Sequence, residues 1–256
     1  MTSRLEYISK SIPVSMADDW FEIANASHFW MQWRMKALLR YKQLLPPASS
    51  RVFEIGCGNG IFMEQLERHL HYTVDGCDLN LKALDLAQPG KGRLMVYNIF
   101  DLNPALIKQY PAVFLMDVIE HIDDDITFLK TATEYLQPQG LVVVNVPAHM
   151  YLFSKYDDAA GHVRRYSKES LRNAFTKAGI EPLKVFYWGG SLIPLAMLRK
   201  QVLRNRTEKI IEQGFAPPNA LTHALLKGVM NVETFLPLNP LSGTSVMAIG
   251  RKIQTT

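Results

Sequence analysis

The stretch that most constrains the fold is Val52–Gly60, an apolar run that ends in three glycines at alternate positions. This pattern predicts a strand and a tight turn, followed by a helix over 61–70. Glycine tolerates positive φ and leaves no Cβ between the turn and a ligand. The first turn of the helix points its unsatisfied N–H groups at the same place. A ligand site is therefore expected where the strand ends.

A second strand, Tyr72–Asp78, ends in an acidic residue, as suits the hydroxyl pair of a ribose. Together, Glu54-x-Gly56-x-Gly58-x-Gly60 and Asp78 resemble the binding site of class I S-adenosylmethionine-dependent methyltransferases. A dinucleotide-binding fingerprint would have its third glycine at position 61, which is Ile61 here.

Two further stretches extend the resemblance. Gly161–Tyr166 is similar to a Gly-His-x-Arg-Arg-Tyr signature in a bacterial subset of the type 11 methyltransferases, and His28–Arg34 is similar to the aromatic lead-in of the type 11 and 12 groups. Asp117–Glu120 has neither the prolines nor the aromatic residue with which amino-group methyltransferases of nucleic acids hold their substrate. Nucleic acid is therefore disfavoured as a partner.

The resemblance implies an α/β fold, a Rossmann-like doubly wound sheet of seven strands in the order 3-2-1-4-5-7-6 with strand 7 antiparallel. Strands are expected at 52–55, 72–78, 94–99, 112–116, 141–146, 183–188 and 245–252. Beside the 61–70 helix, we expect helices at 81–87, 126–136, 168–178 and 220–235, one or two amphipathic helices within 18–45, a turn at 137–140 and an irregular loop at 151–167. The 256 residues are expected to form one domain, with an N-terminal helical cap (1–47), a core (48–188 and 244–253) and a helical insert (189–243).

S-adenosyl-L-methionine is the cofactor that the resemblance implies. The residues expected to bind it are Glu54, Gly56, Cys57, Gly58, Gly60, Asp78, Leu79, Asn98, Ile99, Asp117, Trp33 and Arg34. The family's adenine-binding acid is replaced by Asn98, whose amide oxygen also accepts a hydrogen bond, and Asp101 is the alternative. A helix that carries Trp30, Trp33 and Arg34 could cover the cofactor, because an aromatic face suits a sulfonium cation and Arg34 suits a carboxylate. The alternative, and the usual role of such an aromatic stripe, is core packing.

The segment after the fifth strand is long for a structural connection, and long ordered loops are usually functional. We expect Tyr156, Arg164 and Arg165 to bind the acceptor, and His121, His162 and Tyr166 to be catalytic. Histidine has a suitable pKa for taking a proton from a hydroxyl acceptor. One arginine is expected to pair with Asp157 or Asp158 and the other to bind an anionic substrate group. The alternative is that these residues only order the loop.

No metal site is expected. The acidic run Asp123–Asp125 precedes an apolar-periodic helix, where adjacent aspartates are typical of an N-cap and a first helical turn. The two cysteines, Cys57 and Cys77, are expected to be small buried residues, because they are too few for a disulfide framework or a metal quartet.

Charge and hydropathy limit the partners. The net charge of +4 is mild and compatible with anionic substrates or membrane surfaces. Residues 191–206 combine an apolar face with four basic residues and no acidic one, so they are expected to lie on a membrane surface or over an amphipathic substrate; a lid or dimer helix is the alternative. The sequence shows no signal peptide and no membrane span, so we expect a cytoplasmic protein, with peripheral contact at the inner membrane face as an extension of that prediction.

These features predict an S-adenosylmethionine-dependent methyltransferase that acts on a small-molecule or lipid-linked acceptor, with oxygen as the preferred acceptor atom. One alternative is an RNA or protein methyltransferase. Another is a non-catalytic cofactor-binding module that regulates a partner through the insert.

Overall fold

The structure is a computed structural model, which describes residues 5–10, 21, 25–88, 90–204, 210, 220–235 and 240–253. Within these ranges, eight strands form one sheet. In spatial order the strands are β1 (Glu6–Tyr7), β4 (Leu94–Val96), β3 (Thr73–Asp78), β2 (Arg51–Ile55), β5 (Tyr110–Met116), β6 (Leu136–Pro147), β8 (Ser245–Lys252) and β7 (Ile180–Trp188). β8 is antiparallel to both of its neighbours, and the other pairings are parallel.

The predicted strand order is confirmed for the seven expected strands, including the antiparallel strand β8 between β6 and β7. β1 is an addition at the edge, where two residues pair with Met95 and Val96 of β4. Two residues are too few to produce a recognisable alternation in sequence, so the pattern does not predict this strand.

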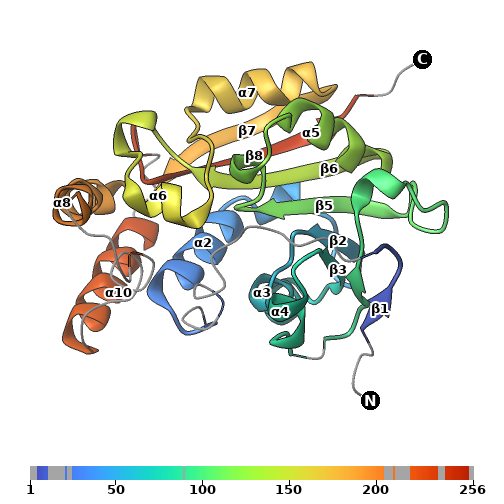
Figure 1. The fold of residues 1–256 in the computed structure, drawn as a ribbon, viewed down its shortest axis with the longest axis horizontal. Helices are drawn as coiled ribbons and strands as arrows, with labels where there is room; N and C mark the ends of the chain where they lie inside the picture. The colour runs from blue at the N-terminus through green and yellow to red at the C-terminus, as the bar shows by residue number, and fades with distance from the viewer. Residues whose placement is uncertain are drawn as a thin grey trace.

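Helices cover both faces of the sheet (Figure 1). The α-helices are α2 (Phe29–Leu39), α3 (Ile61–Leu70), α4 (Leu81–Asp85), α5 (Asp125–Glu134), α6 (Lys155–Ala160), α7 (Lys168–Lys177), α8 (Ile193–Leu203) and α10 (Ala220–Phe235). α5 and α7 pack on one face through side chains such as Phe128 and Phe175. α2, α3 and α4 pack on the other face, where Trp33 and Phe62 lie in the core. Both faces of β6 are thus buried, as its continuous apolar run predicts.

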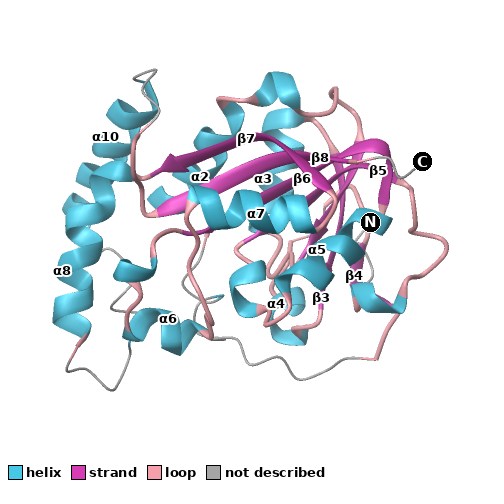
Figure 2. Ribbon diagram, turned by 90° about the horizontal axis from the view of Figure 1, so that it is seen from above, coloured by secondary structure: helices cyan, strands magenta, loops and turns pink. Residues whose placement is uncertain are grey.

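The helices of the expected insert, α8 and α10, stand beyond one end of the sheet, beside α6 (Figures 1 and 2). The carboxylate of Glu233 in α10 accepts hydrogen bonds from the backbone N–H groups of Gly189, Gly190 and Ser191, at 2.7 to 3.1 Å. This contact ties α10 to the chain just before α8. α10 also packs against α2. The division into cap, core and insert stays a prediction.

Several predicted boundaries are wrong. Residues 137–140 do not form a separate turn, because β6 begins at Leu136, which pairs with Tyr110 before the register shifts. The segment expected to be irregular contains α6, which begins at a capping box formed by Ser154 and Asp157. Where one or two helices are predicted within residues 18–45, the structure has α2 and a 3₁₀ helix, Lys42–Leu44. Trp20 lies outside the described residues. Among the described helices, none is both long and apolar enough to cross a membrane.

Candidate active site

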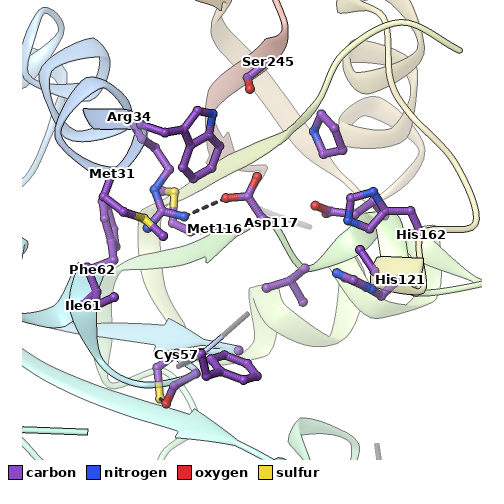
Figure 3. Close-up of a pocket in the computed structure, with 18 of the residues that line it drawn as sticks. Met31, Arg34, Cys57, Ile61, Phe62, Met116, Asp117, His121, His162 and Ser245 are labelled. Atoms are coloured by element: carbon purple, nitrogen blue, oxygen red, sulfur yellow. Dashed lines mark hydrogen bonds and ion pairs between the residues drawn. The ribbon is translucent and has the colours of Figure 1, made fainter. Parts of the chain in front are cut away.

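A cavity of about 750 Å³ lies at the carboxyl ends of β2, β3 and β5, between the glycine turn, α2 and the insert helices. Most of the residues expected to form the site border it. They are Arg34, Glu54, Gly56, Cys57, Gly58, Asp78, Leu79, Asn98, Ile99, Asp117, His121, Tyr156, His162 and Arg165. Gly60, Trp33, Arg164 and Tyr166 do not border the cavity. In Figure 3, Arg34 reaches Asp117 from one side, and His121 and His162 lie on the other side.

The glycine turn has no room for side chains. Gly56 and Gly58 have φ values of 74° and 53°, and a Cβ on them would lie 2.5 Å from Val118 Cγ2 and 2.6 Å from Phe21 Cε1. Only glycine satisfies both the positive φ and the close approach. Gly60 has φ of 74° as well, and its role is to begin α3. This backbone, the glycine cradle, borders the cavity at the start of that helix, and the side chains of Val118 and Phe21 pack against it.

Asp78 is fixed at the rim of this cradle by three backbone N–H groups. Its Oδ2 accepts from Gly58 at 2.8 Å, and its Oδ1 accepts from Leu79 at 2.7 Å and from Asn80 at 2.9 Å. Burial raises the pKa of the Asp78 carboxyl, although these hydrogen bonds oppose the shift. Two carboxylate oxygens offer about four acceptor positions, and three are in use, so Asp78 retains about one, on Oδ2, for a ligand's hydroxyl group.

Glu54 lies at the floor of the cavity and is almost fully buried. Its Oε2 has no hydrogen-bond partner among the described residues. Burial raises the pKa of Glu54 to about 8, against the opposing charge of Arg34 and with the help of Asp78. A buried acceptor without a partner is costly, so this oxygen is suited to a ligand that brings a donor or a positive charge.

The end of β4 presents Asn98 and Ile99 to the cavity. Asn98 Oδ1 accepts from the N–H of Phe100 at 3.1 Å, which caps the 3₁₀ helix Ile99–Asp101. Asp101, the alternative adenine-binding residue, accepts instead from the hydroxyl of Ser9 and does not border the cavity. Asn98 and Ile99 thus stay the candidates for contact with a base.

Arg34 is already paired. Its Nη1 lies 2.6 Å from Asp117 Oδ2, and its guanidinium lies between the rings of Trp30 and Phe62, at 5.2 and 5.0 Å from their centroids. If Arg34 also binds a cofactor carboxylate, as predicted, its guanidinium must hold that carboxylate and Asp117 at the same time. Trp33 is fully buried and lies outside the cavity; Trp30, one turn away on α2, borders it.

A chain of side-chain hydrogen bonds continues from Asp117. The amide Nδ2 of Asn145 donates to Asp117 Oδ1, and Asn145 Oδ1 accepts from Trp188 Nε1, both at 2.8 Å. These bonds join the ends of β5, β6 and β7. Burial raises the pKa of Asp117, whereas the Arg34 charge and its hydrogen bonds lower it. Asp117 acts here as a structural partner for α2.

The two histidines meet edge to face, with ring centroids 4.8 Å apart. His121 Nδ1 lies 3.1 Å from the carbonyl oxygen of Gly161, and His162 Nδ1 lies 2.8 Å from Asp157 Oδ1. Burial, with the charge of His162, lowers the pKa of His121 to about 4. The His121 imidazole is therefore neutral near pH 7.

The two arginines of the signature have different partners, and one pair is the expected one with Asp157. Arg165 pairs with Asp157, with Nε to Oδ1 at 2.7 Å and Nη2 to Oδ2 at 3.0 Å, and the pair is buried. Burial acts to raise the pKa of Asp157, but hydrogen bonds from His162 and Arg165 hold that pKa below its usual range. Arg164 points away from the cavity and pairs with Asp125 at 3.2 Å. This geometry does not support the predicted role of Arg164 in substrate binding, whereas Arg165 borders the cavity as well as ordering the segment.

Tyr166 also requires a correction. It is buried in the core, and its hydroxyl donates to Asp125 Oδ2 at 2.6 Å, so this geometry favours packing over catalysis. Tyr156, in contrast, borders the cavity, and the guanidinium of Arg199 lies over the Tyr156 ring, 4.4 Å from the ring centroid.

The acidic run Asp123–Asp125 lies at the start of α5, as predicted, because the side chain of Asp124 accepts a hydrogen bond from the N–H of Thr127 and caps the helix. Both cysteines are free and buried, as predicted.

Two residues at the site were not predicted. Glu120 borders the cavity and is fully buried, and Asn145 connects the strand ends. A signal was available for both: Asn145 interrupts an otherwise apolar strand, and Glu120 precedes His121 in the stretch that resembles the family. Trp30, which the sequence places in the expected cap, borders the cavity from α2.

The residues present fit S-adenosylmethionine. The glycine cradle, the fixed acceptor Asp78 and the unpartnered oxygen of Glu54 lie together where the resemblance places the cofactor. A backbone cradle at a helix start with an acid at the next strand is the arrangement that ribose-containing cofactors use.

Comparisons with known proteins agree with this geometry. A methyltransferase domain family matches residues 24–185. Ubiquinone biosynthesis O-methyltransferases of Caulobacter sp. and Cereibacter sphaeroides are 30% and 31% identical in alignments of 126 and 104 residues, which cover 43% and 39% of this chain. The matching stretches span only 48% and 42% of those relatives' length.

Solved structures share the fold. The methyltransferase bound to the Trm112 activator of Haloferax volcanii superimposes with a TM-score of 0.62 at 13% identity, over 95% of this chain and 100% of that one. A SAM-dependent methyltransferase from Archaeoglobus fulgidus gives 0.53 at 17% identity, over 85% and 92% of the two chains. The chain therefore belongs to the methyltransferase domain family, and its fold is that of the class I S-adenosylmethionine-dependent methyltransferases.

Proposed function

We propose that this protein transfers a methyl group from S-adenosylmethionine to a hydroxyl oxygen of a small-molecule or lipid-linked acceptor. The observation that carries the proposal is that one cavity joins the glycine cradle to a neutral histidine and an apolar wall. The names of the curated relatives support oxygen as the acceptor atom. Membership of the Gly-His-x-Arg-Arg-Tyr subset is part of the same proposal.

The donor side of the cavity holds the cofactor. Asp78 offers an acceptor position to a ribose hydroxyl, Asn98 and Ile99 border the place of the base, and Glu54 offers an acceptor to a positively charged group. When bound, the cofactor supplies a methyl group on a positively charged sulfur, which an oxygen nucleophile can take. Holding both reactants in one dry cavity accounts for most of the expected acceleration.

His121 is the proposed base. Its Nδ1 faces a carbonyl oxygen, which only accepts, so Nδ1 carries the proton and Nε2 keeps its lone pair. Burial keeps the imidazole neutral, so Nε2 has the lone pair needed to take the proton of an acceptor hydroxyl, and the lowered pKa makes it a weaker base than a free histidine. The neighbouring His162 is fixed by Asp157 and stands ready to orient the acceptor.

The acceptor side has an apolar wall formed by the insert. Leu192, Leu195 and Ala196 of the α8 region and Leu226 of α10 border the cavity. The outer faces of the two helices expose further large apolar side chains: Met197, Leu198, Val202, Leu221, Leu225 and Phe235. A wall that continues into an exposed apolar face suits an acceptor with a hydrocarbon chain.

Peripheral membrane contact through residues 191–206 belongs to this proposal. Of the four basic residues, Arg206 lies outside the described residues, Arg199 stacks on Tyr156, and Lys200 donates to the carbonyl oxygen of Tyr151 at 2.6 Å. Arg204, at the end of α8, is exposed. The apolar face therefore carries the main support for a lipid-linked acceptor.

A labelled methyl donor tests the proposal. The protein is incubated with methyl-labelled S-adenosylmethionine and a lysate, which is then separated into lipid, small-molecule, RNA and protein pools. Label in the lipid or small-molecule pool is the expected result. Label in RNA or protein supports the first alternative, and cofactor binding by calorimetry without any transfer supports a regulatory module.

The His121→Asn variant then tests the base. Turnover should fall by about 100-fold or more, the usual range for a lost general base, with unchanged cofactor affinity. His69→Asn, in an exposed part of α3, is the matched control. Unchanged turnover in His121→Asn contradicts its role.

A further inference from the structure

Three potential ligands converge beside the cavity. One donor atom from each of Glu120, His121 and His162 lies within 4.8 Å of the other two. Glu120 is fully buried, and neither of its carboxylate oxygens has a hydrogen-bond partner among the described residues. Burying a carboxylate without a partner is costly. A positively charged ligand is the chemistry that this cluster lacks.

Because both Nδ1 atoms already have partners, Nε2 is the nitrogen that each imidazole keeps for such a ligand. The Nδ1 atoms of His121 and His162 face the Gly161 carbonyl and the Asp157 carboxylate, at 3.1 and 2.8 Å. These oxygens only accept, so each Nδ1 is a donor, and the lone pair of each imidazole in its neutral form lies on Nε2. Metal-binding histidines are typically held in this way, by a carboxylate or a backbone carbonyl on the other nitrogen.

The two segments that carry the ligands are fastened to each other. The N–H of Val163 donates to the Glu120 carbonyl oxygen at 2.8 Å, next to the bond between His121 and Gly161. Asp157, which holds His162, is itself fixed by two hydrogen bonds from Arg165. The three ligands thus have fixed backbones and a supporting shell before any ion binds.

We infer that Glu120, His121 and His162 form a binding site for one divalent first-row transition-metal ion. Two imidazole nitrogens and one carboxylate oxygen are a donor set that such ions accept, with the remaining positions open to the cavity. Ligand atoms on one ion are about 3.0–3.5 Å apart, given bond lengths of about 2.0–2.2 Å. A spread of up to 4.8 Å therefore closes with side-chain shifts on the order of 1 Å.

This inference reverses the sequence prediction of no metal site. That prediction considered the run Asp123–Asp125, whose members cap and begin α5 and do not belong to the cluster. Metal binding does not require the proposed function, but an ion on His121 Nε2 would occupy the lone pair of the proposed base, so the two roles of His121 exclude each other. The use of the ion in the reaction rests on that function: an acceptor oxygen at an open position of the ion would have a lowered pKa.

Cobalt titration tests the site. The chelator-treated full chain is titrated with Co²⁺, followed by its ligand-field absorption and by calorimetry, and one saturable equivalent is expected. Glu120→Gln and His162→Asn should each weaken Co²⁺ binding at least about tenfold. Glu181→Gln and His69→Asn, at exposed positions, should leave it unchanged. The absence of a saturable site, or unchanged affinity in both cluster variants, overturns the inference.

Two measurements separate this inference from the proposed function. Cofactor affinity, measured by calorimetry without metal, should be retained in Glu120→Gln and His162→Asn, which also shows that these variants are folded. Methyl transfer by a protein that binds no Co²⁺ overturns the metal site alone. Saturable Co²⁺ binding by a protein that transfers no methyl group overturns the proposed function alone.

Discussion

The two sides of the cavity are built by different kinds of contact. The donor side, formed by the glycine turn and Asp78, is held by backbone N–H groups that reach at most 20 residues along the chain. The acceptor side, formed by His121 and residues 154–166, is held by side-chain pairs such as Tyr166 with Asp125, 41 residues apart. The donor side therefore depends on backbone shape, whereas the acceptor side depends on particular charged partners. Substitutions on the two sides should have different effects on folding and on binding.

The largest expected effect concerns the two adjacent arginines of the acceptor side. Arg165→Met leaves the buried carboxylate of Asp157 with only His162 and Ser154, and the free energy of unfolding should fall by about 3–5 kcal/mol. Arg164→Met, whose side chain is 31% exposed, should cost less than about 1 kcal/mol. Chemical denaturation of both variants gives the comparison. Equal losses would contradict the assignment of Arg165 as the buried structural partner.

On the donor side, Glu54 should make stability depend on pH. Its pKa is about 8 in the folded protein against 4.5 unfolded, so the folded state binds the extra proton between these values. The free energy of unfolding should therefore fall as pH rises from about 5 to 8, by an amount on the order of a few kcal/mol. Glu54→Gln should remove much of this slope. Denaturation curves across the pH range test it, and an identical slope in the variant would refute it.

A smaller effect is expected for Asp78→Ala, measured as cofactor affinity. The ribose hydroxyls lose a charged acceptor in a partly buried site, so the affinity for S-adenosylmethionine should fall by about 2 kcal/mol, or roughly 30-fold. The loss of stability should be smaller than that of Arg165→Met. Calorimetric titration beside Asp85→Ala, an exposed control at the end of α4, is the measurement. Unchanged affinity in a folded Asp78→Ala protein would place the ribose elsewhere.

The smallest expected effect is that of Tyr166→Phe. The variant loses the hydrogen bond to Asp125, and the free energy of unfolding should fall by about 1 kcal/mol. Methyl transfer, once an acceptor is known, should stay within about twofold of the wild-type rate, because the hydroxyl does not border the cavity. A large loss of turnover with unchanged stability would restore the catalytic role that the sequence predicts.

The sequence predicts mainly the features that depend on residues close together in the chain, and it misses those that depend on distant pairs. α3 lies over the predicted residues 61–70, and Asp78 lies at the predicted rim, because both depend on neighbours close in sequence. The pairing of Arg34 with Asp117 spans 83 residues and leaves no periodic pattern. α6 was missed because six residues give too little periodicity, although Ser154 and Asp157 form its capping box.

The same reasoning explains why Glu120 was overlooked. In sequence it is one acidic residue after an apolar strand, and acidic residues there are usually exposed first-turn charges. The fold instead buries it against His121 and His162, which a contact between distant segments brings about. Long-range burial of a charged residue is not encoded in any local pattern.

Strand β8 lies between β6 and β7, although it follows the whole insert in sequence. During synthesis at roughly 5–20 residues per second, residues 189–244 take several seconds to emerge after β7. Throughout that interval the apolar edge of β6 has no partner on the side that β8 later occupies. Unpaired apolar edges recruit other chains. The length of the insert therefore sets how long this edge of β6 stays exposed to pairing with other chains before β8 arrives.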